Sequence, residues 1–272
     1  MTPAAYARGV RLRRLFGHDS GKAVIVAWAH GPLLGPLEGL DRRAIETLGE
    51  SLVQADGLLV SPSMLAGLQD VLARRDRPTL FLLQHWQSVS RPSSLLGYEQ
   101  GATAPLCTIE EAAHWGADGV MTYLYVGWSD PEQEARQVAD AADASRACRE
   151  LGLLHMIESR AVRDELTPDG LARSDLVRFH TRLAAELGAD LVKTKWTGSD
   201  TFGEVVAGCP VPVLIAGGAR TRNFEEMLQE ARSMVDAGAS GLVWGRNLFQ
   251  HPRPATALQE LLEVVHGTGT QP

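Results

Sequence analysis

Lysine is scarce in this chain of 272 residues. Of its 26 basic residues, 23 are arginines, and the three lysines are Lys22, Lys193 and Lys195. Arginine replaces lysine as a surface charge, but its guanidinium stays protonated and cannot act as an amine nucleophile. The pair at 193 and 195 therefore marks the place to look for an essential primary amine. Chance retention of a few lysines in an arginine-rich chain is the alternative that composition leaves open.

Other shortages exclude whole classes of protein. No segment approaches the roughly 20 apolar residues of a membrane span, and no secretory signal precedes the basic residues at 8–14. The net charge of −7, with acidic and basic residues interspersed, lacks the basic stripe of a nucleic-acid-binding face. Cys107, Cys148 and Cys209 cannot all pair and have no metal-ligand spacing, which indicates a reducing compartment. We expect a cytoplasmic protein without a nucleic-acid or membrane partner.

Short apolar runs alternate with helical patterns along the whole chain. The runs have the apolar character of strands buried on both faces, and they cover residues 23–28, 57–61, 79–83, 118–124, 153–157, 190–195, 211–216 and 240–244. The helical patterns cover residues 4–16, 42–55, 62–75, 108–116, 131–151, 169–187, 200–207, 223–237 and 254–265. Eight such units favour a (β/α)8 barrel over an open sheet. We predict an α/β fold: a single TIM barrel over residues 1–266 with an extra N-terminal helix, then a disordered tail at 267–272.

Local features refine this prediction. Thr108 followed by Glu111 fits a capping box, and Pro131 after Asp130 fits a first helical turn. The longest loop, about residues 85–107, would lie over the active face as a lid. The spacing of four arginines in the first helix is typical of a solvated helix face; they are Arg8, Arg11, Arg13 and Arg14.

The two lysines of the sixth predicted strand share one face. Side chains alternate along a strand, and Val192 has the apolar character of the helix-facing side, so Lys193 and Lys195 are expected inside the barrel. Crowding and desolvation both disfavour an ammonium ion, which favours a nucleophilic amine able to form a Schiff base. The alternative is that both lysines only form ion pairs with carboxylates such as Glu158.

Glycine and arginine follow the last two predicted strands. Gly217-Gly218 ends the seventh strand, and Gly245-Arg246 ends the eighth. In TIM barrels these two loops often bind phosphate, because backbone N–H groups and an arginine can contact the anion there. We predict phosphate binding at these positions, although Gly217-Gly218 alone would also fit a tight turn.

Histidines give no metal signal. His30, His85 and His155 stand on three different predicted strands without supporting carboxylates, so we assign no metal site. Carbonyl chemistry on a lysine needs neither a metal nor another cofactor, and we expect none.

The sequence resembles the DeoC/LacD superfamily, and within it the archaeal-type class I fructose-bisphosphate aldolases and the related autoinducer-2 thiolase-like proteins. The resemblance spans nearly the whole chain, and its C-terminal half is the specific part. It is carried by Arg13-Arg14-Leu15-Phe16, His30-Gly31-Pro32, Gly35-Pro36, Leu187-Gly188-Ala189-Asp190-Leu191-Val192-Lys193-Thr194, Cys209-Pro210-Val211-Pro212-Val213-Leu214-Ile215-Ala216-Gly217-Gly218 and Gly245-Arg246-Asn247-Leu248-Phe249-Gln250.

This resemblance implies roles for matching residues. It implies that Lys193 forms the Schiff base and that Lys195 helps through charge or substrate contact. It also implies that phosphate binds at the matching glycines and arginine, Gly217, Gly218, Gly245 and Arg246, and that the chain forms a homo-oligomer. His30 and Arg160, at the ends of the first and fifth strands, are further candidates for substrate binding.

Two departures from the family pattern concern proton transfer. The family usually has aspartate where this chain has Ala29, and tyrosine where it has Glu158. A glutamate in a partly apolar barrel mouth can be tuned toward a neutral pKa and serve as general acid or base. Glu158 is therefore the expected replacement, with a plain salt bridge to Lys193, Lys195 or Arg160 as its alternative. Tyr125 matches a family tyrosine at the end of strand four and is a second candidate donor, unless it only packs.

These residues predict a Schiff-base lyase that cleaves or forms a carbon–carbon bond in a phosphorylated keto sugar or related keto compound. The replaced acid–base residues argue against fructose bisphosphate as its substrate. Thiolase-like acyl transfer or condensation on a phosphorylated diketone is one alternative. A phosphosugar-binding relic that kept the lysine and lost turnover is another.

Overall fold

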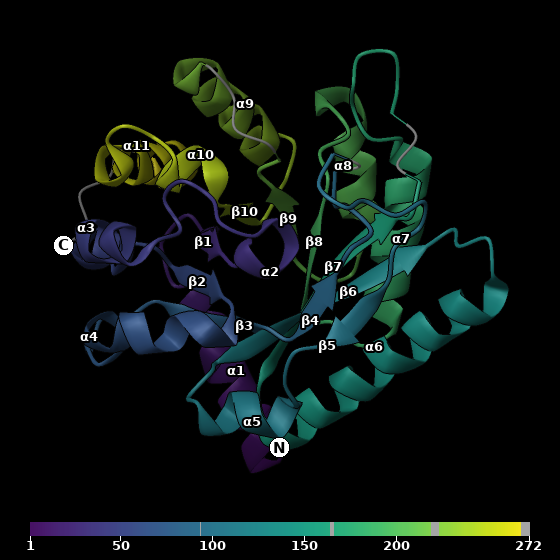
Figure 1. The fold of residues 1–272 in the computed structure, drawn as a ribbon, viewed down its shortest axis with the longest axis horizontal. Coiled ribbons are helices and arrows are strands. Elements are labelled where there is room, and N and C mark those ends of the chain that lie inside the picture. Colours follow the sequence, from purple (N-terminus) through teal and green to yellow (C-terminus); the bar gives the residue numbers. More distant parts are fainter. Residues whose placement is uncertain (93, 164–165, 219–222, 268–272) are drawn as a thin grey trace.

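A computed structural model describes residues 1–92, 94–163, 166–218 and 223–267, and within these ranges all side chains except those of residues 42, 43 and 45–47. Parallel strands close into a barrel in the order β1-β10-β9-β8-β7-β6-β3-β2 (Figure 1). These strands are β1 Ala23–Trp28, β2 Gly57–Val60, β3 Thr79–Leu83, β6 Gly119–Val126, β7 Leu154–Ala161, β8 Leu191–Thr194, β9 Val213–Ala216 and β10 Gly241–Trp244. The predicted (β/α)8 barrel is confirmed. Beyond Gly267, the predicted tail lies outside the described residues.

Helices follow the strands and cover the outside of the barrel (Figure 1). They are α3 Arg42–Leu52, the 3-10 helix η1 Pro62–Leu68 with α4 Gln69–Leu72, α5 Ile109–His114, α6 Pro131–Leu151, α7 Ser174–Glu186, α8 Ser199–Gly208, α9 Phe224–Asp236 and α11 Pro254–His266. The capping box of Thr108 and Glu111 is present, and Asp130 caps α6. Within the described ranges, no helix combines the length and apolarity that a membrane span requires.

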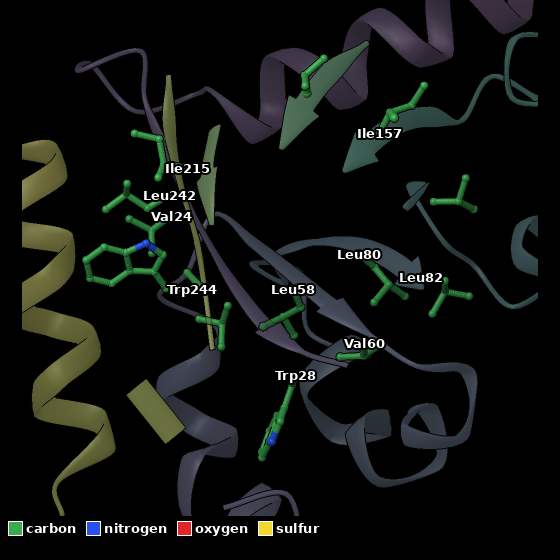
Figure 2. Packing of buried hydrophobic residues seen from close by; sticks show 14 of the residues in the cluster. Val24, Trp28, Leu58, Val60, Leu80, Leu82, Ile157, Ile215, Leu242 and Trp244 are labelled. Atoms are coloured by element: carbon green, nitrogen blue, oxygen red, sulfur yellow. The ribbon is translucent and has the colours of Figure 1, made fainter. Parts of the chain in front are cut away.

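Alternation along the strands creates two apolar layers. One layer lies between strands and helices; Figure 2 shows Val24, Trp28, Leu58 and Leu242 among its buried residues. The other layer fills the barrel interior with side chains of the opposite parity, for example Ile25, and it also includes Ala23, Ala27, Leu59, Phe81, Leu83, Met121, Leu154, Met156, Leu191, Leu214 and Val243. A filled interior leaves the loops at the carboxyl ends of the strands as the place for chemistry.

The long loop contains secondary structure that the sequence pattern did not predict. Within residues 85–107, β4 His85–Gln87 pairs antiparallel with β5 Thr103–Pro105. This hairpin is fixed to the short helix α2 Gly31–Leu34, because Trp86 Nε1 donates to the Pro32 carbonyl at 2.9 Å and Arg91 Nε donates to the Leu33 carbonyl at 3.1 Å. The segment therefore crosses from the end of β3 to the element that follows β1.

The N-terminal helix α1 Pro3–Leu15 closes the amino-terminal end of the barrel. Leu15 is buried in the interior layer, with Leu12 and Phe16 packed against it. The prediction that the arginines of this helix form a solvated face is wrong for Arg8 and Arg11, which are half-buried, whereas Arg13 and Arg14 are exposed. Arg11 and Arg14 pair with Asp118, just before β6, and Arg8 pairs with Asp190, just before β8. Both carboxylates stand more than 100 residues away, so helical spacing could not indicate them.

Candidate active site

Three neighbouring strands bring a tyrosine, a glutamate and a lysine to one level of the barrel. Tyr123 of β6 is the register partner of Glu158 on β7, and Glu158 is the register partner of Lys193 on β8. The residues two positions earlier on these strands belong to the interior apolar layer. Because side chains repeat every second residue, the three polar side chains lie just above that layer, at the carboxyl end of the barrel.

Lys193 is buried and contacts Glu158 directly. Its Nζ lies 2.6 Å from Glu158 Oε2, and only 8% of Lys193 and 5% of Glu158 is exposed. Met121 Sδ lies 4.0 Å from the same nitrogen. The expected interior position of Lys193 is confirmed, and so is the ion pair with Glu158 that the sequence left as an alternative. An ion pair and a catalytic role are compatible, since a nucleophilic amine needs an acceptor for its proton.

Glu158 lies between two cations. Arg160 Nη1 is 3.5 Å from Glu158 Oε1, on the side opposite the lysine contact. Burial alone would raise the pKa of the Glu158 carboxyl, but the charges of Lys193 and Arg160 and the lysine hydrogen bond lower it overall. The expectation of a glutamate tuned toward neutral pKa is therefore wrong: the arrangement keeps a carboxylate, which can accept a proton but holds none to give.

Tyr123 is a site residue that the sequence interpretation missed. Burial and the carboxylate of Glu158 raise its pKa well above the ordinary value for tyrosine, while a hydrogen bond with Gln87 and the charge of Arg160 act in the opposite direction. The alternation that places Lys193 inside the barrel, applied to Met121 on β6, would have found it. Tyr125, the predicted second donor, is fully buried; its hydroxyl lies 3.3 Å from Ser90 Oγ, and its ring stacks on Tyr123 with centroids 5.8 Å apart.

Lys195 lies one residue past the end of β8 and is half-buried. The strand ends at Thr194, so the alternation of side chains along β8 does not place Lys195 inside the barrel with Lys193. The next residue, Trp196, packs against Phe202 of α8, with ring centroids 5.1 Å apart. Lys195 stays a predicted helper at the rim of the barrel.

The predicted phosphate-binding loops meet in space. Arg246, in the short helix α10 Arg246–Phe249, donates through Nη2 to the Gly218 carbonyl at 2.7 Å. Its Nε is buried and has no acceptor among the described residues. Gly217 and Gly245 also have a packing reason, since an added Cβ would lie 2.6 Å from Trp244 and 2.3 Å from the Ala27 carbonyl oxygen, respectively. The Gly217 N–H donates to Val243 O and is not available to an anion.

His30 and Ala29 face the same mouth from β1. Burial and the charges of Lys193 and Arg246 lower the pKa of His30 to about 3, so its imidazole is neutral. Its Nδ1 is buried and unpartnered within the described part of the chain. Ala29 packs against the interior apolar layer, where the family pattern has an acid. Lys193 and Arg160 thus lie beside the Glu158 carboxylate, and Arg246 interacts with Arg160 and with the neutral His30, so that the cations of this mouth suit an anionic ligand.

The described ranges contain no cluster of three or more His, Cys, Asp or Glu side chains that could hold a metal ion. His155 is held in the barrel wall between Thr122 Oγ1 at 2.9 Å and Ser145 Oγ at 2.7 Å. The three cysteines are free and buried. Burial raises the pKa of Cys107 to about 11 and that of Cys148 to about 12, so neither is a ready thiolate.

Comparison with known proteins gives a consistent family. The model of the DeoC/LacD family aldolases matches residues 24–251. An uncharacterized aldolase of Saccharolobus solfataricus is 32% identical over 259 residues, which are 94% of this chain and 93% of that protein. The 2-amino-4,5-dihydroxy-6-oxo-7-(phosphonooxy)heptanoate synthase of Streptomyces griseus is 30% identical over 98% of this chain and 93% of its own length.

Solved structures agree with the sequence comparison. An archaeal fructose-1,6-bisphosphate aldolase, with its catalytic lysine covalently bound to the carbinolamine intermediate of the substrate, superposes with a TM-score of 0.80. The match has 25% identity and covers 96% of this chain and 100% of that one. A Schiff-base-forming fructose-1,6-bisphosphate aldolase matches with a TM-score of 0.79 and 26% identity, over 95% of this chain and 99% of its own.

Proposed function

Because the chain belongs to the DeoC/LacD aldolase family, we propose that Lys193 is the amine through which it makes or breaks carbon–carbon bonds. The protein is a class I aldolase-type lyase that acts on a phosphorylated keto compound. Residue roles within this function rest on the geometry at the carboxyl end of the barrel.

One observation carries the assignment of Lys193. In a chain with three lysines, this one lies near the carboxyl end of a barrel strand, is buried, and has its Nζ 2.6 Å from a carboxylate. Lys22 is bonded to a backbone carbonyl, that of Ala239, at 3.0 Å. Lys193 is thus a primary amine with an adjacent carboxylate that can accept its proton, and attack on a ketone requires both.

The reaction begins with proton transfer from the Lys193 ammonium to Glu158. The neutral amine attacks the keto carbon, a C–N bond forms, and the carbonyl electron pair moves to oxygen, which takes a proton from the new ammonium nitrogen to give a carbinolamine. Glu158 returns its proton to the carbinolamine hydroxyl, which leaves as water, so that an iminium ion forms and Glu158 is ionised again. This cation attracts the electron pair of the adjacent carbon–carbon bond, which breaks as a base removes the proton of the neighbouring hydroxyl. Glu158, kept ionised by its cations, is that base.

The substrate phosphate is placed by the cationic side of the mouth. Arg246, Gly218 and Gly245 lie at the ends of β9 and β10, and β9 is the neighbour of β8. Arg160 and His30 extend this surface across the opening, where they share electrostatic interactions with Lys193 and Arg246. A phosphate next to the keto group would thereby be held while Lys193 reaches the carbonyl.

The Streptomyces relative suggests a donor. The product named in this synthase carries a ketone at carbon 6, a phosphate ester at carbon 7, and hydroxyls at carbons 4 and 5. Cleavage between carbons 4 and 5 of such an aldol gives a three-carbon keto phosphate and an aldehyde. We propose that this chain uses the same donor, dihydroxyacetone phosphate. With Ala29 and Glu158 where the fructose-bisphosphate aldolases have aspartate and tyrosine, its aldehyde partner differs from that of those enzymes.

Reductive trapping tests the proposal. The protein is incubated with dihydroxyacetone phosphate and with a panel of other ketose phosphates, reduced with borohydride, and digested for peptide mass mapping. The expected result is a stable adduct on Lys193 and none on Lys22. If no compound of the panel gives an adduct, the protein does not use Schiff-base chemistry on these compounds. If the adduct persists in Lys193→Met, a residue other than Lys193 provides the amine.

Product analysis separates the remaining alternatives. If the protein forms the adduct but turns the keto phosphate over only when an acyl acceptor is present, it is a thiolase-like transferase. If the protein binds the keto phosphate but never exchanges a substrate proton with solvent, it is a phosphosugar-binding relic without turnover.

A further inference from the structure

Tyr123 has no role in the chemistry described so far, yet its hydroxyl-bearing side chain shares a level of the barrel with Glu158 and Lys193. It stands on β6, whose residue Met121, two positions earlier, contacts the Lys193 nitrogen. The three polar side chains therefore form a row across β6, β7 and β8, with the carboxylate in the middle.

The surroundings raise the pKa of the Tyr123 phenol and lower the pKa of the Glu158 carboxyl. Burial and a neighbouring negative charge keep the Tyr123 phenol protonated, while two neighbouring cations keep Glu158 ionised. Adjacent titratable groups held in opposite protonation states are a means by which enzymes separate an acid from a base. Glu158 can accept a proton but carries none at the start, so a separate donor is needed.

The hairpin of β4 and β5 holds the phenol from outside the barrel. Gln87 of β4 interacts with Tyr123, which counters the rise in the pKa of the phenol, and it donates through Nε2 to Ser90 Oγ at 2.6 Å. Ser90 Oγ in turn contacts the Tyr125 hydroxyl, and Tyr125 stacks on Tyr123. Because the hairpin is also fixed to α2, the phenol is supported by an element that spans the mouth (Figure 1).

We propose that Tyr123 is the general acid of the reaction and that it works as a pair with Glu158, a role that rests on the proposed Schiff-base function. As the carbon–carbon bond breaks, Glu158 takes the hydroxyl proton, the aldehyde forms, and the electron pair moves through the iminium to give an enamine. Tyr123 gives its proton to the enamine carbon, which restores the iminium. The phenolate then takes the proton from Glu158, with Arg160 nearby to offset its charge. The hydroxyl proton thus ends on carbon, and no other reactant is needed.

Proton exchange by the donor alone measures this step. Dihydroxyacetone phosphate is incubated with the full chain in D2O, and loss of the proton beside the keto group is followed by NMR, with borohydride trapping on the same samples. In Tyr123→Phe, we expect exchange to slow by about 10²-fold or more while the Lys193 adduct still forms. Tyr98→Phe makes the same change on a tyrosine that is 61% exposed in the long loop, and it should exchange at the wild-type rate.

The outcomes distinguish this proposal from the proposed function. Wild-type protein that forms no Lys193 adduct overturns both. An adduct with undiminished exchange in Tyr123→Phe overturns only the role of Tyr123, and slowed exchange in Tyr125→Phe instead would transfer that role to Tyr125.

A fluorinated tyrosine at position 123 gives a second readout that does not depend on the folding of the Phe variant. Its phenol is more acidic, so a general acid there loses its proton at lower pH. The alkaline limb of the exchange rate should therefore move to lower pH. A limb that stays in place contradicts the proposal.

Discussion

The two ends of the barrel each carry a buried carboxylate paired with cations, and the two ionic clusters are built differently. At the amino-terminal end, the carboxylate of Asp118 is the centre; Arg14 lies at 2.5 Å and Arg77 at 2.6 Å. At the carboxyl end, the centre is the pair of Lys193 and Glu158. Both carboxyls have a lowered pKa although burial alone would raise it. The direction of a pKa shift therefore does not by itself separate a structural cluster from a site.

The partners of the central group do separate them. Asp118 Oδ2 also accepts the Leu80 N–H at 2.9 Å, so this carboxylate is bonded into the backbone of β3. The Lys193 nitrogen, in contrast, contacts two side chains, Glu158 and Met121. The cations paired with Asp118 are arginines, whereas Glu158 pairs with a lysine as well as with Arg160. A permanent charge suits a clamp, and an amine that can lose its proton suits a covalent step.

Lysine-to-arginine changes test this difference most strongly. Lys193→Arg keeps the charge but removes the amine, so we expect kcat to fall by at least about 10⁴-fold, as for loss of other nucleophiles. Lys22→Arg is the matched control: it lies at the amino-terminal side of β1, and a guanidinium can still donate to the Ala239 carbonyl. Steady-state kinetics on both variants measure kcat. Equal losses of kcat in Lys193→Arg and Lys22→Arg would contradict a special role for the lysine at the carboxyl end of the barrel.

Removal of the proton acceptor is the next largest change. Glu158→Gln preserves shape and a hydrogen-bond acceptor for Lys193 but cannot take a proton, so kcat should fall by about 10²- to 10³-fold. In the wild type, the lowered pKa of Glu158 keeps the base active, so the acid limb of kcat/KM should lie below the ordinary range of a carboxyl. Glu132→Gln, at an exposed site on α6, serves as the control. Wild-type kcat in Glu158→Gln would make this cluster structural, like that of Asp118.

The converse holds for the amino-terminal end, where stability and not activity should change. Asp118→Asn leaves arginines without their carboxylate, and because these side chains are partly exposed we expect a loss of about 2–3 kcal/mol in the free energy of unfolding. Urea denaturation measures it, with kcat expected to stay near wild type below the melting temperature. Asp76→Asn, which breaks an exposed pair with Arg74, should leave the midpoint unchanged. A loss of activity in folded Asp118→Asn would contradict the separation of the two ends.

Sequence patterns predicted the barrel and its amine because both depend on local signals. Eight apolar runs define the strands, and the alternation of Val192 and Lys193 needs no knowledge of distant residues. The hairpin at 85–87 and 103–105 was missed because its strands are only three residues long and lack apolar alternation. Alternation along β6 would have placed Tyr123 inside the barrel with Met121, but nothing local to β6 indicates that it lies beside Glu158 of β7. The pKa of Glu158 was misjudged for a related reason, since it depends on two cations that only the fold brings together.

The arginines of α1 give the finest test of the comparison. Arg8 lies 3.5 Å from Asp190, and its side chain is 30% exposed, so Arg8→Gln should lower stability by less than about 1 kcal/mol at pH 7. Burial raises the pKa of Asp190, while Arg8 acts against that rise. A raised carboxyl pKa makes the folded state hold its proton more tightly, so stability is lost as pH rises from the unfolded pKa through the folded one. Loss of Arg8 enlarges that penalty only where Asp190 is ionised.

The effect of Arg8→Gln should therefore be present at neutral pH and vanish in acid below the titration of Asp190. Arg13→Gln, on the exposed side of the same helix, should have no such pH dependence. Urea unfolding of both variants across pH measures the difference. Identical pH profiles would return Arg8 to the solvated face that helical spacing predicted, and the clamp at this end would then consist of the Asp118 cluster alone.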